Sequence, residues 1–386
     1  MSITTPRGFR AAGVAAGIKT SGNLDLALVV NDGPEYAAAA VFTRNKVKAA
    51  PVLWSEQVLA TGRLRAVVLN SGGANACTGP EGFQTTHATA EKAAELLGCG
   101  AIEVAVCSTG LIGAQLPRDM VLAGVEKAAV AMDTTAEAGL SAATAIMTTD
   151  TVAKQAIHTD PAGWSVGGFA KGAGMVAPSM ATMLAVLSTD ATVGAPALHD
   201  ALRAAVRVTF DRLDIDGSTS TNDTVIVMAS GASGVAADPP ALAAAFTAVC
   251  RDLARQLQAD AEGVTKRIIV QVTGAATEDD AVVVARSVAR DSLVKTAMFG
   301  GDPNWGRIAA AVGYADAAVD PGRLDVTING RTLCRGGVAV GEREGTDLSG
   351  ADIVVEIGLG FGDGAAEILT TDLSHAYVEE NSAYSS

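Results

Sequence analysis

The chain has 386 residues, of which 49% are apolar and 18% are charged, so it carries enough apolar surface for a large buried core and is not expected to be disordered. Its formal net charge of −14, without a cluster of Lys and Arg, argues against a partner that presents a phosphate backbone. No apolar run approaches the length of a membrane span, and the first residues lack the pattern of a secretion signal, so we expect a cytoplasmic protein.

The first half of the chain alternates short apolar runs, typical of strands, with Ala-rich stretches typical of helices. Strands are predicted at 24–30, 36–42, 65–69 and 104–107, and helices at 81–97, 119–132 and 135–147. The second half continues with predicted strands at 182–187, 224–229 and 266–272, and with predicted helices at 195–210 and 240–261.

These elements predict a mixed α/β fold. Several strand pairs look like hairpins and the helices come in blocks, so a helix-sheet-sheet-helix sandwich fits better than one parallel sheet. A predicted helix at 278–299 and strands at 324–328 and 353–357 indicate a smaller second α/β unit. We expect the sandwich to cover 1–277, the smaller domain 278–370 and a C-terminal tail 371–386.

Cysteine and histidine residues indicate neither a disulfide framework nor a metal centre. No Cys-x-x-Cys pair occurs, and no two ligand residues have the helical spacing of a zinc site, so we expect buried thiols and no bound metal. The residues are Cys77, Cys99, Cys107, Cys250, Cys334, His87, His158, His199 and His375.

A glycine-bearing loop from Lys171 ends at Thr182, which opens an apolar run. If the Thr182 Oγ attacks the carbonyl of Ala181, an N-to-O acyl shift forms an ester, and hydrolysis of that ester leaves Thr182 as a new chain start. Its α-amine, with a reference pKa of about 8, then serves as the base for its own hydroxyl. The alternative is an ordinary Gly-rich loop that enters a strand.

A second candidate is the turn at Thr109 and Gly110, where a predicted strand ends. Such a turn can direct a backbone N–H and a hydroxyl at one point, as the oxyanion of an acyl transfer requires. Taken alone, an ordinary strand-to-helix turn is the better interpretation, and Cys107 is a weak candidate nucleophile because no histidine is near it in the sequence. The Gly-rich segments 70–79 and 358–364 lack the context of nucleotide-binding loops and are predicted to be turns.

Seven segments, taken in order, resemble the ornithine acetyltransferase family, also called glutamate N-acetyltransferase, of arginine biosynthesis. They are 70–79, 108–113, 147–151, 171–184, 216–224, 294–307 and 380–386, so the resemblance covers nearly the whole chain. It implies self-cleavage between Ala181 and Thr182, an α chain of 1–181, a β chain of 182–386 and a heterotetramer of two copies of each. It also implies an N-terminal-nucleophile-like αββα sandwich with a smaller α/β domain, and a C-terminal tail that returns to the active site.

The resemblance further implies the roles of individual residues. Thr182 is the nucleophile, and Thr109 with Gly110 forms the oxyanion hole. The positions that match substrate-binding residues are Thr148, Lys171, Thr182, Glu262, Asn381 and Ser386. Lys171 would pair with the carboxylate of N2-acetylornithine, and Glu262 with its distal ammonium group.

The implied reaction is ping-pong transfer of the acetyl group from N2-acetylornithine to glutamate through an acetyl-threonyl ester, with no metal or redox cofactor. The sequence leaves open whether acetyl-CoA is a second donor. Two other functions remain as alternatives: a self-processed aminopeptidase or amidase that gives the acyl group to water, and an uncleaved binding protein. The chain differs from the family pattern at Gly73, Ser179, Ser218 and Gly301, none of which is a proposed catalytic residue.

Overall fold

A computed structural model describes residues 2–177, 183–342 and 344–383. Contacts divide the chain into two compact units, which are described separately. Unit 1 comprises 1–211 and 218–257, and unit 2 comprises 212–217 and 258–386. None of the described helices is long and apolar enough to cross a membrane.

Unit 1 contains two sheets. The first has four strands in the order β1-β2-β4-β5, and the second has five strands in the order β3-β9-β8-β7-β6. The strands are β1 (Phe9–Val14), β2 (Leu26–Asn31), β3 (Ala37–Phe42), β4 (Ala66–Ser71), β5 (Val104–Thr109), β6 (Lys154–Thr159), β7 (Ser165–Lys171), β8 (Leu184–Thr189) and β9 (Thr224–Ala229).

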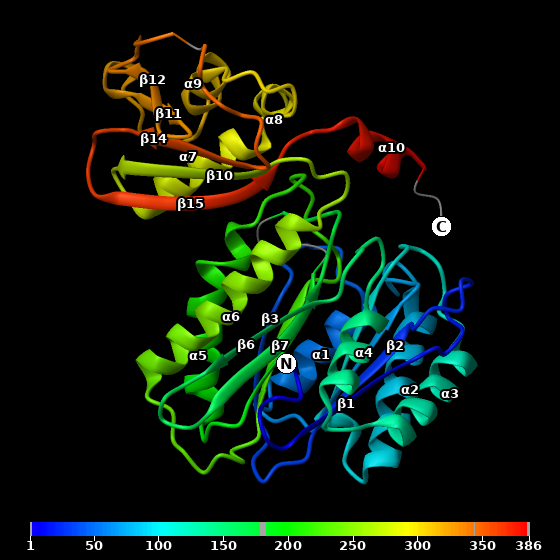
Figure 1. Ribbon diagram of the computed structural model, residues 1–386. Helices are drawn as coiled ribbons and strands as arrows, with labels where there is room; N and C mark the ends of the chain where they lie inside the picture. Colours follow the sequence, from blue (N-terminus) through cyan, green and yellow to red (C-terminus); the bar gives the residue numbers. More distant parts are fainter. Residues whose placement is uncertain (1, 178–182, 343, 384–386) are drawn as a thin grey trace. The chain divides into compact units, whose positions relative to one another are not determined.

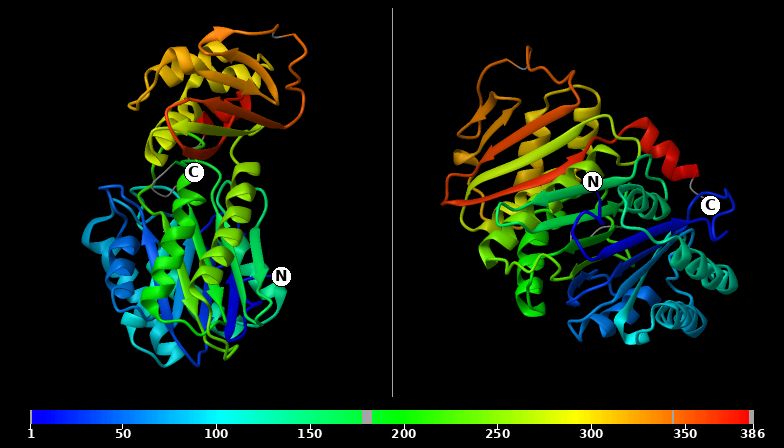
Figure 2. Two further views of the ribbon diagram at one scale, coloured as in Figure 1. Left: turned by 90° about the vertical axis from the view of Figure 1, so that its left-hand side faces the viewer. Right: turned by 60° about the horizontal axis from the view of Figure 1, so that its bottom comes forward.

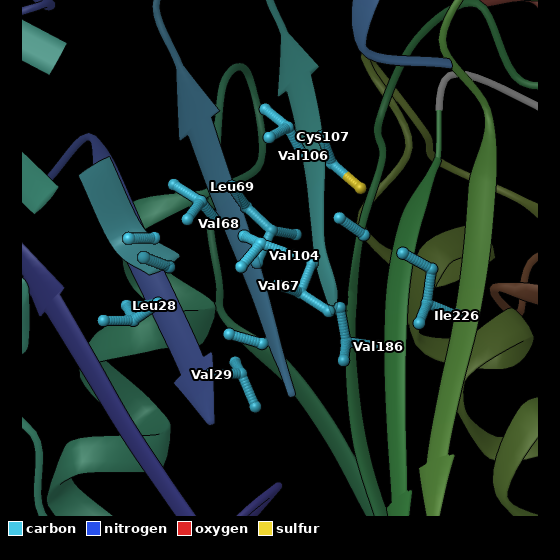
Figure 3. Close-up of a cluster of buried hydrophobic side chains, with 14 of the residues drawn as sticks. Leu28, Val29, Val67, Val68, Leu69, Val104, Val106, Cys107, Val186 and Ile226 are labelled. Atoms are coloured by element: carbon cyan, nitrogen blue, oxygen red, sulfur yellow. The ribbon is translucent and has the colours of Figure 1, made fainter. Parts of the chain in front are cut away.

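The two sheets face each other across one hydrophobic core. Val67 of the first sheet belongs to the same buried cluster as Val186 and Ile226 of the second, and Figure 3 shows side chains of both sheets in the space between them. Every residue of β2, β4, β5, β8 and β9 is buried. Strands covered on both faces carry continuous apolar runs instead of alternating ones, and this is the pattern in the sequence.

Helices cover the outer faces of both sheets. In Figures 1 and 2 the cyan helices α2 and α3 lie beside the first sheet, and the green helices α5 and α6 lie beside the second. The helices of this part of the chain are α1 (Ala50–Leu59), α2 (Gly79–Leu97), α3 (Arg118–Ala131), α4 (Ala136–Ala145), α5 (Ala195–Arg207) and α6 (Pro239–Ala259). The expected αββα sandwich is therefore confirmed.

Unit 2 is built on one six-stranded sheet in the order β13-β12-β11-β14-β10-β15. The strands are β10 (Arg267–Ala275), β11 (Asp325–Ile328), β12 (Arg331–Arg335), β13 (Val338–Ala339), β14 (Asp352–Gly358) and β15 (Gly364–Thr371). Buried residues of α7, such as Val284 and Val288, pack with Val270 and Ile368 of the sheet in a second core. The helices are α7 (Glu278–Arg290), α8 (Ser292–Phe299), α9 (Trp305–Gly313) and α10 (His375–Ala383).

Three details of the prediction differ from the structure. The predicted helix 278–299 is two helices, because the Asp291 side chain accepts a hydrogen bond from the Val294 N–H at 2.8 Å and starts α8. The predicted domain boundary at 277 differs from the division at 257, because β10 pairs in parallel with β14 and in antiparallel with β15 and so belongs to the second sheet. The predicted strand 182–187 corresponds to β8, which begins at Leu184.

Candidate active site

The turn at Thr109 and Gly110 lies at the end of β5. Thr109 is buried and its carbonyl accepts a hydrogen bond from the Gly73 N–H at 3.1 Å. Gly110 has a φ of +134°, and a Cβ at this position would lie 2.5 Å from the Gly73 nitrogen. A side chain at position 110 is therefore blocked by backbone atoms that are themselves hydrogen-bonded, so the turn requires glycine.

Asn222, the second residue before β9, supports this turn. Its Nδ2 donates to the carbonyls of Ala74 at 2.6 Å and of Ser108 at 2.8 Å. The Ser108 hydroxyl in turn donates to the Asn70 Oδ1 at 2.6 Å. Segment 70–79 thus holds the end of β5 in place, in keeping with the structural role predicted for it.

Lys171 brings together two of the predicted site residues. It is the last residue of β7 and is 1% exposed. Its ammonium group donates to the Thr148 hydroxyl at 2.8 Å and lies 3.5 Å from the Thr109 hydroxyl. Thr109, Thr148 and Lys171, which are far apart in the sequence, therefore form one cluster.

Asp150 joins this cluster and was not identified from the sequence. Its Oδ1 accepts hydrogen bonds from the Lys154 ammonium and the Gly172 N–H, both at 2.7 Å. Its Oδ2 accepts the Thr148 N–H at 3.1 Å and lies 3.6 Å from the Lys171 ammonium. The only sequence signal was its place in segment 147–151, beside Thr148, because nothing in the spacing predicts that both lysines reach it.

The charges of this cluster suit an anion. Burial alone would raise the pKa of Asp150, but the nearby ammonium groups of Lys171 and Lys154 outweigh it and hold that pKa well below its usual range. The Lys19 ammonium donates to the Met147 carbonyl at 2.6 Å, and the charges of Asp25, Lys171 and Asp150 act on it. Buried ammonium groups of this kind can bind a carboxylate.

Glu262 and Asn381 lie together in unit 2. The Asn381 amide on α10 donates to the Glu262 Oε2 at 3.0 Å and to the Tyr377 carbonyl at 3.0 Å. Burial, with the negative charges of Asp216 and Glu262, raises the pKa of Tyr377 to about 12, so its hydroxyl stays protonated. The helix α10 therefore presents Asn381 to Glu262 as part of an ordered element.

Three predicted site residues, Ala181, Thr182 and Ser386, lie outside the described residues. Cys107 is buried, and its burial raises the pKa of its thiol to about 12, so it does not supply a thiolate nucleophile near neutral pH. Within 2–177, 183–342 and 344–383, no group of three or more His, Cys, Asp or Glu residues is placed to hold a metal ion.

Comparison with known proteins identifies the family. The ArgJ family model matches residues 10–386. The chain belongs to the ArgJ family. An arginine biosynthesis bifunctional protein ArgJ from Mycolicibacterium paratuberculosis is 64% identical over 100% of this chain and 96% of its own length. Another from Streptomyces coelicolor is 58% identical over 100% of both chains.

A solved ArgJ structure from Bacillus halodurans is 37% identical and matches with a TM-score of 0.50. The match covers 51% of this chain and 97% of the solved chain. As a member of the ArgJ family, this chain is an acetyl-transferring enzyme of arginine biosynthesis. A hydrolase that gives its acyl group to water is not the favoured function.

Proposed function

We propose that the chain is a self-processing acetyltransferase that moves the acetyl group from N2-acetylornithine to glutamate through an acetyl ester on Thr182. The observation that carries this proposal is the cluster in unit 1, where the Lys171 ammonium lies 2.8 Å from the Thr148 hydroxyl and 3.5 Å from the Thr109 hydroxyl. A buried cation, two hydroxyls and a glycine turn are what an acyl transfer between amino acids needs at one place.

Self-cleavage supplies the nucleophile. The Thr182 Oγ attacks the carbonyl carbon of Ala181, the C–N bond breaks, and the nitrogen takes the proton that the hydroxyl loses. Water then hydrolyses the ester and leaves an α chain of 1–181 and a β chain of 182–386. The solved Bacillus halodurans chain, matched over 97% of its length, covers only 51% of this chain, which supports a mature protein made of two pieces.

In the acetyl transfer, Thr182 first accepts the acetyl group from N2-acetylornithine and then gives it to glutamate. The free α-amine of Thr182 takes the hydroxyl proton as Oγ attacks the acetyl carbonyl, and the turn at Thr109 and Gly110 stabilises the oxyanion. Ornithine leaves with that proton on its amine. Glutamate then attacks the ester with its amine, and Thr182 recovers its proton as acetylglutamate departs.

The substrate contacts follow from charge. Lys171 and Thr148 bind the α-carboxylate that both substrates carry, because an ammonium group beside a hydroxyl can both pair with and donate to a carboxylate. Glu262, which accepts a hydrogen bond from Asn381 at 3.0 Å, binds the distal ammonium of ornithine, and Ser386 is a further substrate-binding residue. The mature protein is an α2β2 heterotetramer. Acetyl-CoA is a second acetyl donor to be tested with glutamate as the acceptor.

The test combines mass and product analysis. We expect purified protein to appear as two chains by intact mass and to form acetylglutamate only when N2-acetylornithine and glutamate are both present. Thr182→Ala should remain one full-length chain without activity, because both the cleavage and the acyl carrier need Oγ. Two fragments in the variant would mean that another protease cuts the chain. Free acetate formed at the same rate with and without glutamate would assign the protein to the hydrolases instead.

A further inference from the structure

Asp223 lies beside the residue that follows the proposed nucleophile. Its Oδ1 accepts a hydrogen bond from the Met183 N–H at 3.1 Å. That nitrogen belongs to the peptide bond that joins Met183 to Thr182. On the other side of the same residue, the Met183 carbonyl accepts the Thr224 N–H at 3.1 Å. Met183 is therefore fixed through both of its peptide groups, directly before β8 begins.

The Asp223 carboxyl group is fully buried, and its second oxygen is unusual. Asp223 is 0% exposed, and its Oδ2 has no hydrogen-bond partner among the residues that the structure describes. A buried carboxylate oxygen without a donor is strongly disfavoured, whereas a protonated carboxyl group is tolerated. Burial raises the pKa of Asp223 well above its usual range, and the contacts from Met183 and Ser220 and the charge of Lys171 lower it less. Both observations favour a neutral carboxyl group, and since Oδ1 accepts the Met183 N–H, Oδ2 is the oxygen that would carry its proton.

Asn222, the residue before Asp223, holds the turn at Thr109 and Gly110. Asn222 donates to the Ser108 carbonyl at 2.8 Å, and Ser108 directly precedes Thr109. Two consecutive side chains thus reach in two directions: Asn222 fixes the oxyanion turn, and Asp223 fixes the peptide group next to the nucleophile. The backbone of this pair is itself anchored, because the Thr43 N–H donates to the Asp223 carbonyl at 2.9 Å.

We propose that Asn222 and Asp223 form a positioning pair for the reaction at Thr182: Asn222 holds the turn at Thr109 and Gly110, and Asp223, acting as a neutral hydrogen-bonding group, holds the N–H of Met183, the next residue after Thr182. This inference rests on the proposed function of Thr182. Asp223 takes no proton from the substrate and forms no bond to it. It acts through the Met183 peptide group, so its loss misplaces Oγ without removing a substrate contact.

Three variants test the role of Asp223. Asp223→Ala removes both oxygens, whereas Asp223→Asn keeps an acceptor for the Met183 N–H and puts an N–H donor where the neutral acid has its O–H. Asp190→Ala is the control: Asp190 is also buried, and it directly follows the opposite end of β8, where its Oδ1 accepts the Ser165 N–H at 2.7 Å. The readouts are the rate of self-cleavage by intact mass, kcat and KM for both substrates, and the dependence of kcat on pH.

A misplacement of about 1 Å lowers a rate by about 100-fold, so we expect losses of that order in kcat and in self-cleavage for Asp223→Ala, with KM nearly unchanged. Asp223→Asn should stay close to wild type in both rates and in its pH profile. Asp190→Ala should cleave and turn over like wild type even where its melting temperature falls as far as that of Asp223→Ala.

Provided that wild type transfers acetyl groups to glutamate, two results would overturn the positioning role of Asp223. One is wild-type cleavage and kcat in Asp223→Ala. The other is an Asp223→Asn variant as slow as Asp223→Ala, because that would assign Asp223 an ionised role. If wild type itself fails to cleave or to transfer, the proposed function fails instead. Should Asp223→Ala not fold, the comparison of Asp223→Asn with wild type still decides between a neutral and an ionised group.

Discussion

Asp150 and Asp223 are both buried in unit 1, but their surroundings shift their pKa values in opposite directions. Asp150 faces the ammonium groups of Lys154 and Lys171, which lower its pKa. Asp223 lies among neutral groups, with Lys171 as the charge that acts on it, and its burial raises its pKa. The surroundings of this residue type thus favour an ionised carboxylate at one position and a neutral carboxyl group at the other.

This difference predicts two opposite pH dependences of the free energy of unfolding. The unfolded pKa of Asp is about 4, and that of folded Asp150 is lower, so its stabilisation is complete above about pH 4 and is lost as the pH falls further. The advantage of wild type over Asp150→Asn should therefore shrink at acid pH. Folded Asp223 has a raised pKa, so its contribution is complete below about pH 4 and is lost as the pH rises. Asp223→Asn should therefore gain relative to wild type as the pH rises.

Urea unfolding between pH 3 and pH 8 measures both effects. Using the Thr182→Ala background keeps the chain in one piece, and adding Trp305→Phe leaves Trp54 and Trp164, both in unit 1, as the fluorescent reporters. Parallel pH curves for the two Asn variants would contradict the assignment of opposite charge states. A gain of stability by Asp150→Asn at neutral pH would contradict the role of Asp150 as an ionised partner of two lysines.

The turn at Thr109 and Gly110, which is the proposed oxyanion hole, has a shape that depends on the absence of a side chain. Gly110 and Gly113 both have positive φ angles, of +134° and +92°, so an alanine at either position carries backbone strain. They differ in their surroundings. A Cβ on Gly110 would lie 2.5 Å from the Gly73 nitrogen, whereas a Cβ on Gly113 would meet no atom within 4 Å.

This contrast makes Gly113→Ala a matched control for Gly110→Ala. Loss of one oxyanion donor lowers kcat by about 100-fold to 1,000-fold, and we expect Gly110→Ala to fall in that range because the turn must move. Gly113→Ala should keep most of the activity, since only backbone strain is added. Steady-state kinetics on folded protein, verified by circular dichroism, measure both. Equal losses in the two variants would show that strain, and not the approach of Gly73, controls the turn.

The elements were largely predictable because their signals are local. Strands covered on both faces give continuous apolar runs, as in 224–229, which the structure places in β9. The break between α7 and α8 was missed because Asp291 interrupts an apolar helical pattern that continues on both sides, and its capping bond to Val294 is invisible to periodicity.

The candidate site was predictable only in part. The Thr109 and Gly110 turn follows a recognisable strand, so a local pattern suggested it. Asp150 and Asn222 were missed for different reasons. The partners of Asp150, Lys154 and the Gly172 N–H, are brought to it by the pairing of β6 with β7, which the spacing of residue types does not show. Asn222 reaches the Ser108 carbonyl across 114 positions, a contact that arises only when the two sheets pack.

At the scale of the molecule, the proposed cleavage point interrupts a single sheet. The five-stranded sheet has the order β3-β9-β8-β7-β6, in which β8 and β9 follow the proposed cut and the other three strands precede it. Val166–Lys171 of β7 pairs with Leu184–Thr189 of β8, and β9 pairs with β3 along its whole length. The two central strands from one side of the cut are therefore enclosed by strands from the other side.

This topology predicts that the two chains produced by the proposed cleavage do not separate under native conditions. Each backbone hydrogen bond contributes about 1 kcal/mol net, and separation would break two ladders at once and expose the core shared by both sheets. Size-exclusion chromatography of cleaved protein should give one species that contains both chains by mass spectrometry, with separate elution only in denaturant. Likewise, residues 1–181 produced alone should not form a folded, soluble protein, because they lack β8 and β9. Native elution of the two chains apart, or a cooperatively folded 1–181 fragment, would refute a sheet built from both sides of the cut.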